Sequence, residues 1–244
     1  MLSLALAACG GGGGGSSSEP QAQGSAAVPA PPTNPVLIEA YGDSTMAGLT
    51  YPDGPTLPSS VSPDNQPSVM QAELQSKYGS SVTVTNMGVS GTRAPQLVDG
   101  SDGVHLPWIQ TVANSSAQIV IVNYGINDSF ATSEGIDAYK AALRMIADTA
   151  TQAGKLIVFE QPNPVCLSGL NNEEYSVLGT FAQAMAEIAT EKSIPLVDNY
   201  EYVKSLPNWK DMLSDCTHPK AELYKIEAGR MSSVVVPLVD KLKG

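Results

Sequence analysis

The sequence predicts an α/β fold in which a doubly wound, parallel sheet lies between two layers of helices. Short apolar runs alternate with longer segments of helical periodicity from Val36 onward. The run Ile119–Val122 is apolar throughout, as expected of a strand that is covered on both faces. Strands that alternate with helices in this way pair in parallel, because each crossover helix packs on a face of the sheet.

Each expected element follows from a local pattern. The strand Val36–Tyr41 is bounded by Pro35 and Gly42, and the helix Ser68–Tyr78 stops at Gly79. The other expected strands are Val82–Thr85, Ile119–Val122, Leu156–Phe159 and Pro195–Val197. The other expected helices are Glu134–Ala153, Glu173–Glu191 and Ala221–Leu242, the last interrupted or bent near Pro237. The Pro-rich segment Thr50–Pro67 is too irregular to assign.

Three segments divide the chain of 244 residues. Residues 1–9 are apolar and end in Leu-Ala-Ala-Cys, which resembles the lipobox of a bacterial lipoprotein signal peptide. Cleavage before Cys9 would let its thiol carry a diacylglycerol. No Lys or Arg precedes this short run, so we expect the true start of the protein to lie upstream. Residues 10–35, rich in Gly, Ser, Ala and Pro, predict a flexible tether, and residues 36–244 predict one globular domain.

Composition limits the classes of partner. Apolar residues make up 42% of the chain and charged residues 15%, which allows a substantial core. The net charge of −11 repels phosphate backbones, so we expect no nucleic-acid partner. No run reaches the about 18 apolar residues of a membrane span, so we expect membrane contact only through an N-terminal lipid. We expect a monomer in the cell envelope, lipid-anchored at the outer membrane or in the periplasm, or a secreted one.

The cysteines allow one disulfide. If Cys9 is lipidated, Cys166 and Cys216 remain as a pair in an oxidising compartment. A bridge between them would close a loop of about 50 residues and stabilise the fold by roughly 4 kcal/mol in the chain-entropy model. Two buried free thiols are the alternative.

A serine and a histidine stand where catalysis is expected, beyond the carboxyl ends of the strands. Ser44 follows the first strand in Gly-Asp-Ser-Thr, a tight turn that would expose its hydroxyl. It needs a general base. His218 follows Asp215 by three residues, so the carboxylate can accept the Nδ1 proton while Nε2 faces the serine. The other histidine, His105, is interpreted as a loop or surface residue without a positioned carboxylate.

Two further strand ends carry hydrogen-bond donors. Gly88, in Asn-Met-Gly-Val-Ser-Gly, permits close approach of its N–H to a developing oxyanion. Asn127, in Gly-Ile-Asn-Asp, has a side-chain amide that could point at the same oxygen. Each of these short motifs also has an ordinary interpretation as turn chemistry.

Taken in order, these motifs resemble the SGNH hydrolase family, often called GDSL-type esterases, in a bacterial lipoprotein form. The resemblance spans about residues 38–218, with Thr45 where the eponymous pattern has leucine. It implies a flavodoxin-like, three-layer α/β/α sandwich with a five-stranded parallel sheet. It also implies a triad of Ser44, Asp215 and His218, and an oxyanion hole formed by Ser44, Gly88 and Asn127. It implies no cofactor, and we expect no metal because no cluster has ligand spacing.

The expected function is therefore hydrolysis of carboxylic esters through an acyl-enzyme. The expected substrate is a short-chain acyl or O-acetyl ester, such as an acylated saccharide. Acyl or O-acetyl transfer, lysophospholipase and thioesterase activity on the same site remain alternatives, as does a non-catalytic binding module. Apolar residues near strand ends are candidates for the rim of the site, and they are Tyr51, Ile126, Phe130, Val165, Leu167, Trp209 and Met212.

Overall fold

The computed structural model describes residues 34–131, 135–167 and 173–244. The lipobox, Cys9 and nearly all of the expected tether lie outside these residues, as does the first residue of the expected helix at Glu134. Within the described part of the chain, no helix combines the length and the apolar composition needed to cross a bilayer.

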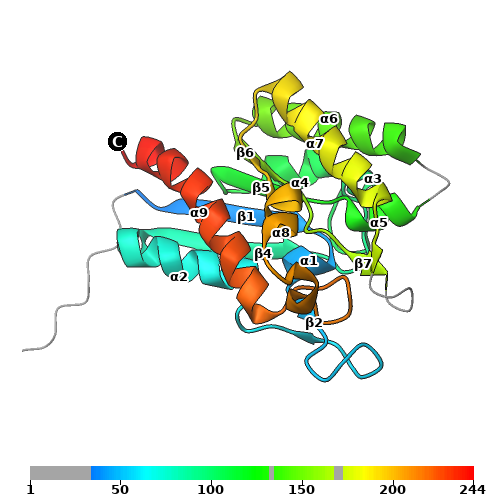
Figure 1. Ribbon diagram of the computed structural model, residues 1–244. Helices are drawn as coiled ribbons and strands as arrows, with labels where there is room; N and C mark the ends of the chain where they lie inside the picture. The colour runs from blue at the N-terminus through cyan, green and yellow to red at the C-terminus, as the bar shows by residue number, and fades with distance from the viewer. Residues whose placement is uncertain (1–33, 132–134, 168–172) are drawn as a thin grey trace, which may run out of the picture. The chain divides into compact units, whose positions relative to one another are not determined.

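A parallel sheet forms the centre of the domain (Figure 1). Its strands are β1 (Val36–Gly42), β4 (Val82–Gly88), β5 (Ile119–Asn123), β6 (Leu156–Glu160) and β9 (Leu196–Val197). They lie in the order β4-β1-β5-β6-β9, and every neighbouring pair is parallel. Counted along the chain, this is the order 2-1-3-4-5 of flavodoxin-like sheets. The predicted α/β fold with a five-stranded parallel sheet is confirmed.

Helices cover both faces of this sheet (Figure 1). One layer contains α2 (Gln66–Tyr78) and α9 (Ala221–Lys243), and the other contains α3 (Ala94–Asp99), α4 (Trp108–Asn114), α6 (Gly135–Gln152) and α7 (Val177–Lys192). The apolar strand β5 shows why both layers are needed. Ile119 and Ile121 belong to the core formed with α2 and α9, whereas Val120 and Val122 belong to the core formed with α6 and α7.

Short elements fill the connections. They are α1 (Ser44–Ala47), β2 (Leu49–Thr50), β3 (Ser60–Val61), the 3₁₀ turn η1 (Gly79–Ser81), α5 (Ile126–Phe130), β7 (Cys166–Leu167), β8 (Glu173–Glu174), α8 (Asn199–Ser205) and the 3₁₀ turn η2 (Trp209–Met212). The Pro-rich segment thus contributes the antiparallel pair β2–β3.

Two expected helices need correction. The helix predicted to begin at Glu173 begins at Val177, because residues 173 and 174 pair with β7 as an antiparallel strand. The helix predicted to be interrupted or bent near Pro237 is not interrupted there, and continues through the proline as α9. Val235 and Val239, one turn apart on either side of the proline, are both buried in the core, so tertiary packing keeps this turn helical.

Candidate active site

The turn after β1 presents Ser44 at the edge of the sheet. A Cβ atom at Gly42 would lie 2.5 Å from the carbonyl oxygen of Asn123, so only glycine lets β1 approach β5 this closely. Asp43 then caps α1: its Oδ1 accepts hydrogen bonds from the N–H and the hydroxyl of Thr45, both at 2.9 Å. Burial raises the pKa of Asp43, against the opposing effect of these two bonds. Ser44 therefore stands in the first turn of a short helix with a fixed start.

Ser44, His218 and Asp215 form one hydrogen-bonded chain. His218 Nε2 lies 2.9 Å from Ser44 Oγ, and His218 Nδ1 lies 2.7 Å from Asp215 Oδ2. The other carboxylate oxygen of Asp215 accepts the backbone N–H groups of Thr217 and His218. Burial by itself would raise the pKa of Asp215, but the hydrogen bonds and charge of His218 lower it below its usual range. An ionised Asp215 holds the His218 proton on Nδ1 and leaves Nε2 to accept from the serine.

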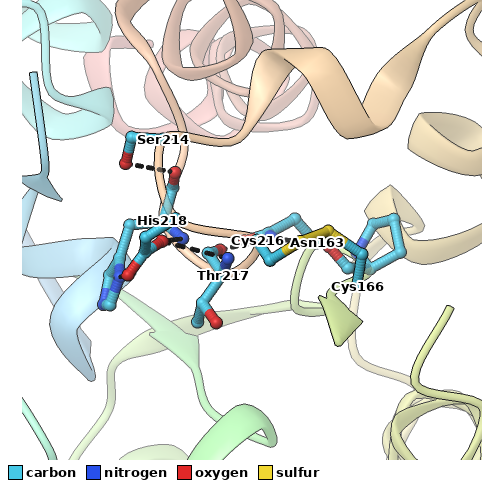
Figure 2. Close-up of a disulfide and its surroundings, with 8 residues drawn as sticks. Asn163, Cys166, Ser214, Cys216, Thr217 and His218 are labelled. Atoms are coloured by element: carbon cyan, nitrogen blue, oxygen red, sulfur yellow. Dashed lines mark hydrogen bonds and ion pairs between the residues drawn. A yellow bond between two sulfur atoms is a disulfide. The ribbon is translucent and has the colours of Figure 1, made fainter. Parts of the chain in front are cut away.

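The turn that carries Asp215 and His218 is attached to the loop after β6. Cys216 forms a disulfide with Cys166, and the Cys166 N–H donates to the Cys216 carbonyl at 2.8 Å. The side-chain amide of Asn163 donates to the Thr217 carbonyl at 3.0 Å. Figure 2 shows these contacts converging on the turn from one side. Cys216 also has a positive φ of 71°, a conformation that non-glycine residues rarely adopt.

A second set of bonds closes the same turn on itself. The Ser214 hydroxyl donates to the His218 carbonyl at 2.9 Å (Figure 2). The Ser214 N–H donates to the same carbonyl at 2.8 Å. Ser214 Oγ in turn accepts the N–H of Tyr51 at 3.1 Å. The imidazole of His218 is therefore positioned by its own turn, by the disulfide loop and by the segment that follows α1.

Ser44 and His218 line a pocket of about 220 Å³. The other lining residues are Leu49, Ser90, Gly91, Ile126, Asn127, Phe130 and Thr217. The pocket thus joins the segments that follow β1, β4 and β5 to the turn before α9. Pockets for drug-sized ligands usually measure about 300–1,000 Å³, so this one fits a small group.

Gly88, the glycine expected to donate to an oxyanion, makes other contacts in the structure. Its N–H donates to Oδ1 of Asn86 at 2.9 Å, and Gly88 is not among the residues that line the pocket. A Cβ atom at this position would lie 2.3 Å from the backbone nitrogen of Ala47, so Gly88 is needed to let α1 pack against β4. Gly88 serves packing rather than the pocket.

Gly91, three residues further on, takes the place at the pocket. Its φ of 79° suits glycine, and a Cβ atom there would meet nothing within 4 Å. Within residues 34–131, 135–167 and 173–244, its N–H has no recorded acceptor. The sequence signal was present, because Asn86–Gly91 contains two glycines three residues apart and either one follows the strand closely.

Asn127 lies in the pocket wall and is held by two acceptors. Its Nδ2 donates to the Thr92 carbonyl at 3.0 Å and to Asp43 Oδ2 at 3.3 Å. These bonds link α5 to the turn after β1 and to the loop after β4. The structure therefore brings Ser44, Asn127 and His218 together, as the sequence analysis expects.

Asp128 lies directly behind this wall. Its Oδ1 accepts the N–H of Ala94 at 3.1 Å, and its Oδ2 has no hydrogen-bond partner in the described part of the chain. Burial raises the pKa of Asp128 to about 7, against the opposing effect of the Ala94 bond. Asp128 thus joins the helix that carries Asn127 to the loop that carries Gly91, a connection that the sequence analysis missed.

His105 lies in a loop, one of the two expected alternatives, but its side chain is buried and has the positioned carboxylate that the sequence analysis did not expect. Its Nδ1 lies 2.6 Å from Oδ2 of Asp102, and the two side chains are 5% and 0% exposed. Asp102 Oδ1 accepts the N–H groups of Val104 and His105, so this turn repeats the Asp-x-x-His geometry of residues 215–218. The imidazole packs against the ring of Tyr41, with ring centroids 5.3 Å apart. In the described part of the chain it has no serine hydroxyl partner, which separates it from His218.

A buried carboxyl group ends β6. Glu160 is fully buried, and its Oε1 accepts the side-chain amides of Gln66 and Asn199 at 2.5 and 2.6 Å. Its Oε2 has no partner among the residues that the structure describes. Burial raises the pKa of Glu160 to about 7, despite these amide bonds. A proton on Oε2 would remove the buried charge, so the neutral acid suits this position.

Five of the seven candidate rim residues divide into two groups. Ile126 and Phe130 line the pocket, and the ring of Tyr51 lies 5.5 Å from that of His218. Val165 and Trp209 are buried in the core instead. No group of three or more His, Cys, Asp or Glu side chains in the described ranges has an arrangement that could hold a metal ion.

Comparison with known proteins places this geometry in a family context. Residues 40–226 match the model of the GDSL-like Lipase/Acylhydrolase family. No curated protein sequence matches the chain significantly. Among solved structures, an alpha/beta hydrolase enzyme from the metagenome of Lake Arreo, Spain, is 16% identical with a TM-score of 0.64, and the match covers 82% of this chain and 95% of that one.

Two other solved structures are similar to the same extent. An acetylxylan esterase from Geobacillus stearothermophilus is 19% identical with a TM-score of 0.62, and the match covers 82% of this chain and 94% of that one. A lipase/acylhydrolase from Enterococcus faecalis is 15% identical with a TM-score of 0.63, and the match covers 82% and 95% of the two chains. At such identities the likeness is one of fold.

Proposed function

Because the chain belongs to the GDSL-like lipase/acylhydrolase family and is a carboxylic ester hydrolase, we propose that it works through an acyl-enzyme on Ser44. The observation that carries this proposal is the 2.9 Å contact between Ser44 Oγ and His218 Nε2, with Asp215 on the far side of the imidazole. A serine hydroxyl becomes an effective nucleophile when a positioned base removes its proton.

The cycle begins when His218 Nε2 takes the Ser44 proton as Oγ attacks the ester carbon. Asp215 stabilises the imidazolium that forms, and His218 then gives the proton to the departing alcohol. Water enters, loses a proton to His218 and attacks the acyl carbon. The acid leaves, and the proton returns to Ser44. Ester and water thus give acid and alcohol.

Three donors stabilise the oxyanion in this proposal. They are the N–H of Ser44, the N–H of Gly91 and Nδ2 of Asn127. Gly91 replaces Gly88 because it lines the pocket and its N–H has no recorded acceptor in the described ranges, whereas the Gly88 N–H is engaged by Asn86. The contact of Asn127 Nδ2 with Asp43, at 3.3 Å, is the longer of its two bonds and the one that a developing negative charge would displace.

The substrate in this proposal is an ester of a short acyl group. Support comes from the pocket volume of about 220 Å³ and from the apolar walls that Leu49 and Ile126 give it. Such a pocket fits an acetyl or similar group more closely than a long alkyl chain. Transfer of the acyl group to an alcohol would use the same acyl-enzyme, and analysis of the products with and without an added alcohol separates the two reactions.

We also propose that Cys9 carries a lipid that anchors the domain in the cell envelope. Support comes from the Leu-Ala-Ala-Cys run and from the Gly/Ser/Pro-rich composition of residues 10–35. Cys9→Ser is expected to move the protein from the membrane fraction to the soluble fraction of cells. Unchanged fractionation of that variant would contradict the anchor.

The test of the enzymatic proposal is a serine-reactive probe combined with an assay. The protein is expected to hydrolyse p-nitrophenyl acetate faster than p-nitrophenyl octanoate and to be labelled by a fluorophosphonate. Ser44→Ala is expected to lose both properties, whereas Ser233→Ala, at an exposed serine of α9, keeps both. Labelling of the Ser44→Ala variant, or its retention of activity, would overturn the assignment of the nucleophile.

A further inference from the structure

An exposed aromatic ring stands at the rim of the pocket. Phe130 is the last residue of α5, the helix that also carries Asn127, and it lines the pocket together with Ser44 and His218. Its side chain remains 48% exposed. Single exposed apolar residues are common on protein surfaces. The argument therefore depends on what holds this ring and on where it faces.

A second ring supports Phe130 from another segment. Tyr175 stacks on Phe130, with centroids 4.8 Å apart and planes inclined by 21°. The Tyr175 hydroxyl donates to the Ser129 carbonyl at 3.0 Å, and its N–H donates to the Val165 carbonyl at 2.9 Å. Tyr175 is thereby fixed to α5 and to the loop after β6. The stack holds the Phe130 ring in one orientation, so the rim presents a preorganised apolar face.

The position of this face decides which part of a substrate meets it. The pocket accepts the small acyl group, so the alcohol part of the ester extends outward past the rim. Phe130 lines the same pocket as the polar residues Ser90 and Thr217, and its exposed ring can meet a group that extends out of the pocket. A group that suits this surface combines a flat face of C–H bonds with hydroxyl groups at its edge. A pyranose ring has this combination, and its C–H face packs on an aromatic ring.

This inference rests on the proposed esterase function and narrows its substrate. We propose that the alcohol part of the substrate is a saccharide whose ring stacks on Phe130 while its acyl group enters the pocket at Ser44. Phe130 then determines specificity for the alcohol, and Tyr175 holds it in place. An extended alkyl chain would instead need a long apolar groove in which to bury its surface, whereas the pocket that contains Ser44 is small.

The experiment compares two acetate esters. The substrates are a monoacetylated methyl glucopyranoside and glyceryl triacetate, which lacks a sugar ring. Phe130→Leu, which keeps an apolar side chain but removes the flat face, is expected to lower kcat/KM for the sugar ester about tenfold, mainly through KM. Its kcat/KM for glyceryl triacetate is expected to fall by clearly less, so the ratio of the two kcat/KM values, sugar ester over glyceryl triacetate, should decrease. Phe130→Tyr is expected to retain both activities.

The control is Ile109→Ala, at an apolar residue of α4 that is 67% exposed and outside the pocket; both activities are expected to stay unchanged. Equal loss of both activities in Phe130→Leu would overturn the saccharide proposal, because the residue would then serve only the pocket wall. A selective loss on p-nitrophenyl octanoate would overturn it in favour of an acyl-chain site. Absence of all esterase activity in the unmodified protein would instead reject the proposed function.

Discussion

The N–H of Ala94 donates a hydrogen bond to Asp128 Oδ1 at 3.1 Å, and this bond joins the two segments that carry Gly91 and Asn127, both of which line the pocket. Ala94 begins α3, directly after the loop that contains Gly91, and Asp128 follows Asn127 in α5. The distance between two of the three proposed oxyanion donors, Gly91 and Asn127, therefore depends on a buried carboxyl group that does not itself line the pocket.

Removal of that carboxyl group is expected to slow the chemical step. In Asp128→Ala the Ala94 N–H loses its acceptor, and a misplaced donor costs about 10–100-fold in kcat. KM for p-nitrophenyl acetate is expected to change little. Asp128→Asn retains a carbonyl oxygen for the Ala94 N–H and is expected to stay within a few-fold of the unmodified enzyme. Full kcat in a correctly folded Asp128→Ala variant, verified by circular dichroism, would contradict this positioning role.

The side chain of Asn127 is expected to contribute to catalysis rather than to binding. Asn127→Ala removes a donor that acts on the charge that develops on the acyl oxygen, and loss of such a donor lowers kcat by about 10²–10³-fold. Steady-state kinetics on p-nitrophenyl acetate measure this effect, and KM should stay nearly constant. A variant that loses affinity but keeps kcat would assign Asn127 to the substrate instead.

The disulfide is expected to stabilise the fold and the triad turn together. Reduction frees a loop with a sequence separation of 50 residues, which corresponds to roughly 4 kcal/mol in the chain-entropy model. Dithiothreitol should therefore lower the melting temperature and the activity. The double variant Cys166→Ser/Cys216→Ser should resemble the reduced protein and show no further response to dithiothreitol. Identical melting curves with and without reductant would argue against a structural role.

Stability is expected to decrease with rising pH through the titration of Glu160. Its pKa is raised from 4.5 to about 7 by burial, so the folded state keeps a proton that the unfolded state loses between these values. The free energy of unfolding should fall across this window and then level off. The titration of Asp128 should also lower the free energy of unfolding as the pH rises, because its pKa is likewise raised to about 7.

Glu160→Gln tests this pH dependence because the amide keeps a carbonyl oxygen for Gln66 and Asn199 but cannot ionise. The melting temperature of the variant should depend less on pH between about 4.5 and 7 and should exceed that of the unmodified protein at pH 8. Asp53→Asn, at an exposed loop residue, provides a neutral comparison. Lower stability of Glu160→Gln at pH 8 would mean that the ionised form is the stabilising one.

Much of the fold could be predicted because its patterns are local. The central strands are apolar runs with clear boundaries, and β5 is apolar on both faces because both faces are covered. The pair β7–β8 could not be predicted, because strands of two residues exist only through their pairing with each other. The course of α9 through Pro237 depends likewise on burial that the local sequence does not reveal.

In the candidate site, too, some features could be predicted from local sequence patterns, whereas others depend on contacts in the folded chain. Ser44 and Asn127 follow strand ends, where the topological rule places candidate site residues, and both line the pocket. The sequence could not choose between Gly88 and Gly91, because the choice depends on the bond from Gly88 to the side chain of Asn86. His105 and His218 have the same spacing from an aspartate and the same turn geometry. Only a contact with a distant serine distinguishes them, and such a contact is a property of the folded chain.

The bond between Ser44 and His218 joins residues that are 174 positions apart. Closing a loop over such a separation costs chain entropy, so it is slow. The contact becomes favourable only after the strands between the two residues have paired. Recovery of turnover after dilution from denaturant should therefore trail the recovery of helical signal, and fragments that end before His218 cannot form the pair. Enzymatic activity is thus a reporter of long-range assembly rather than of local helix formation.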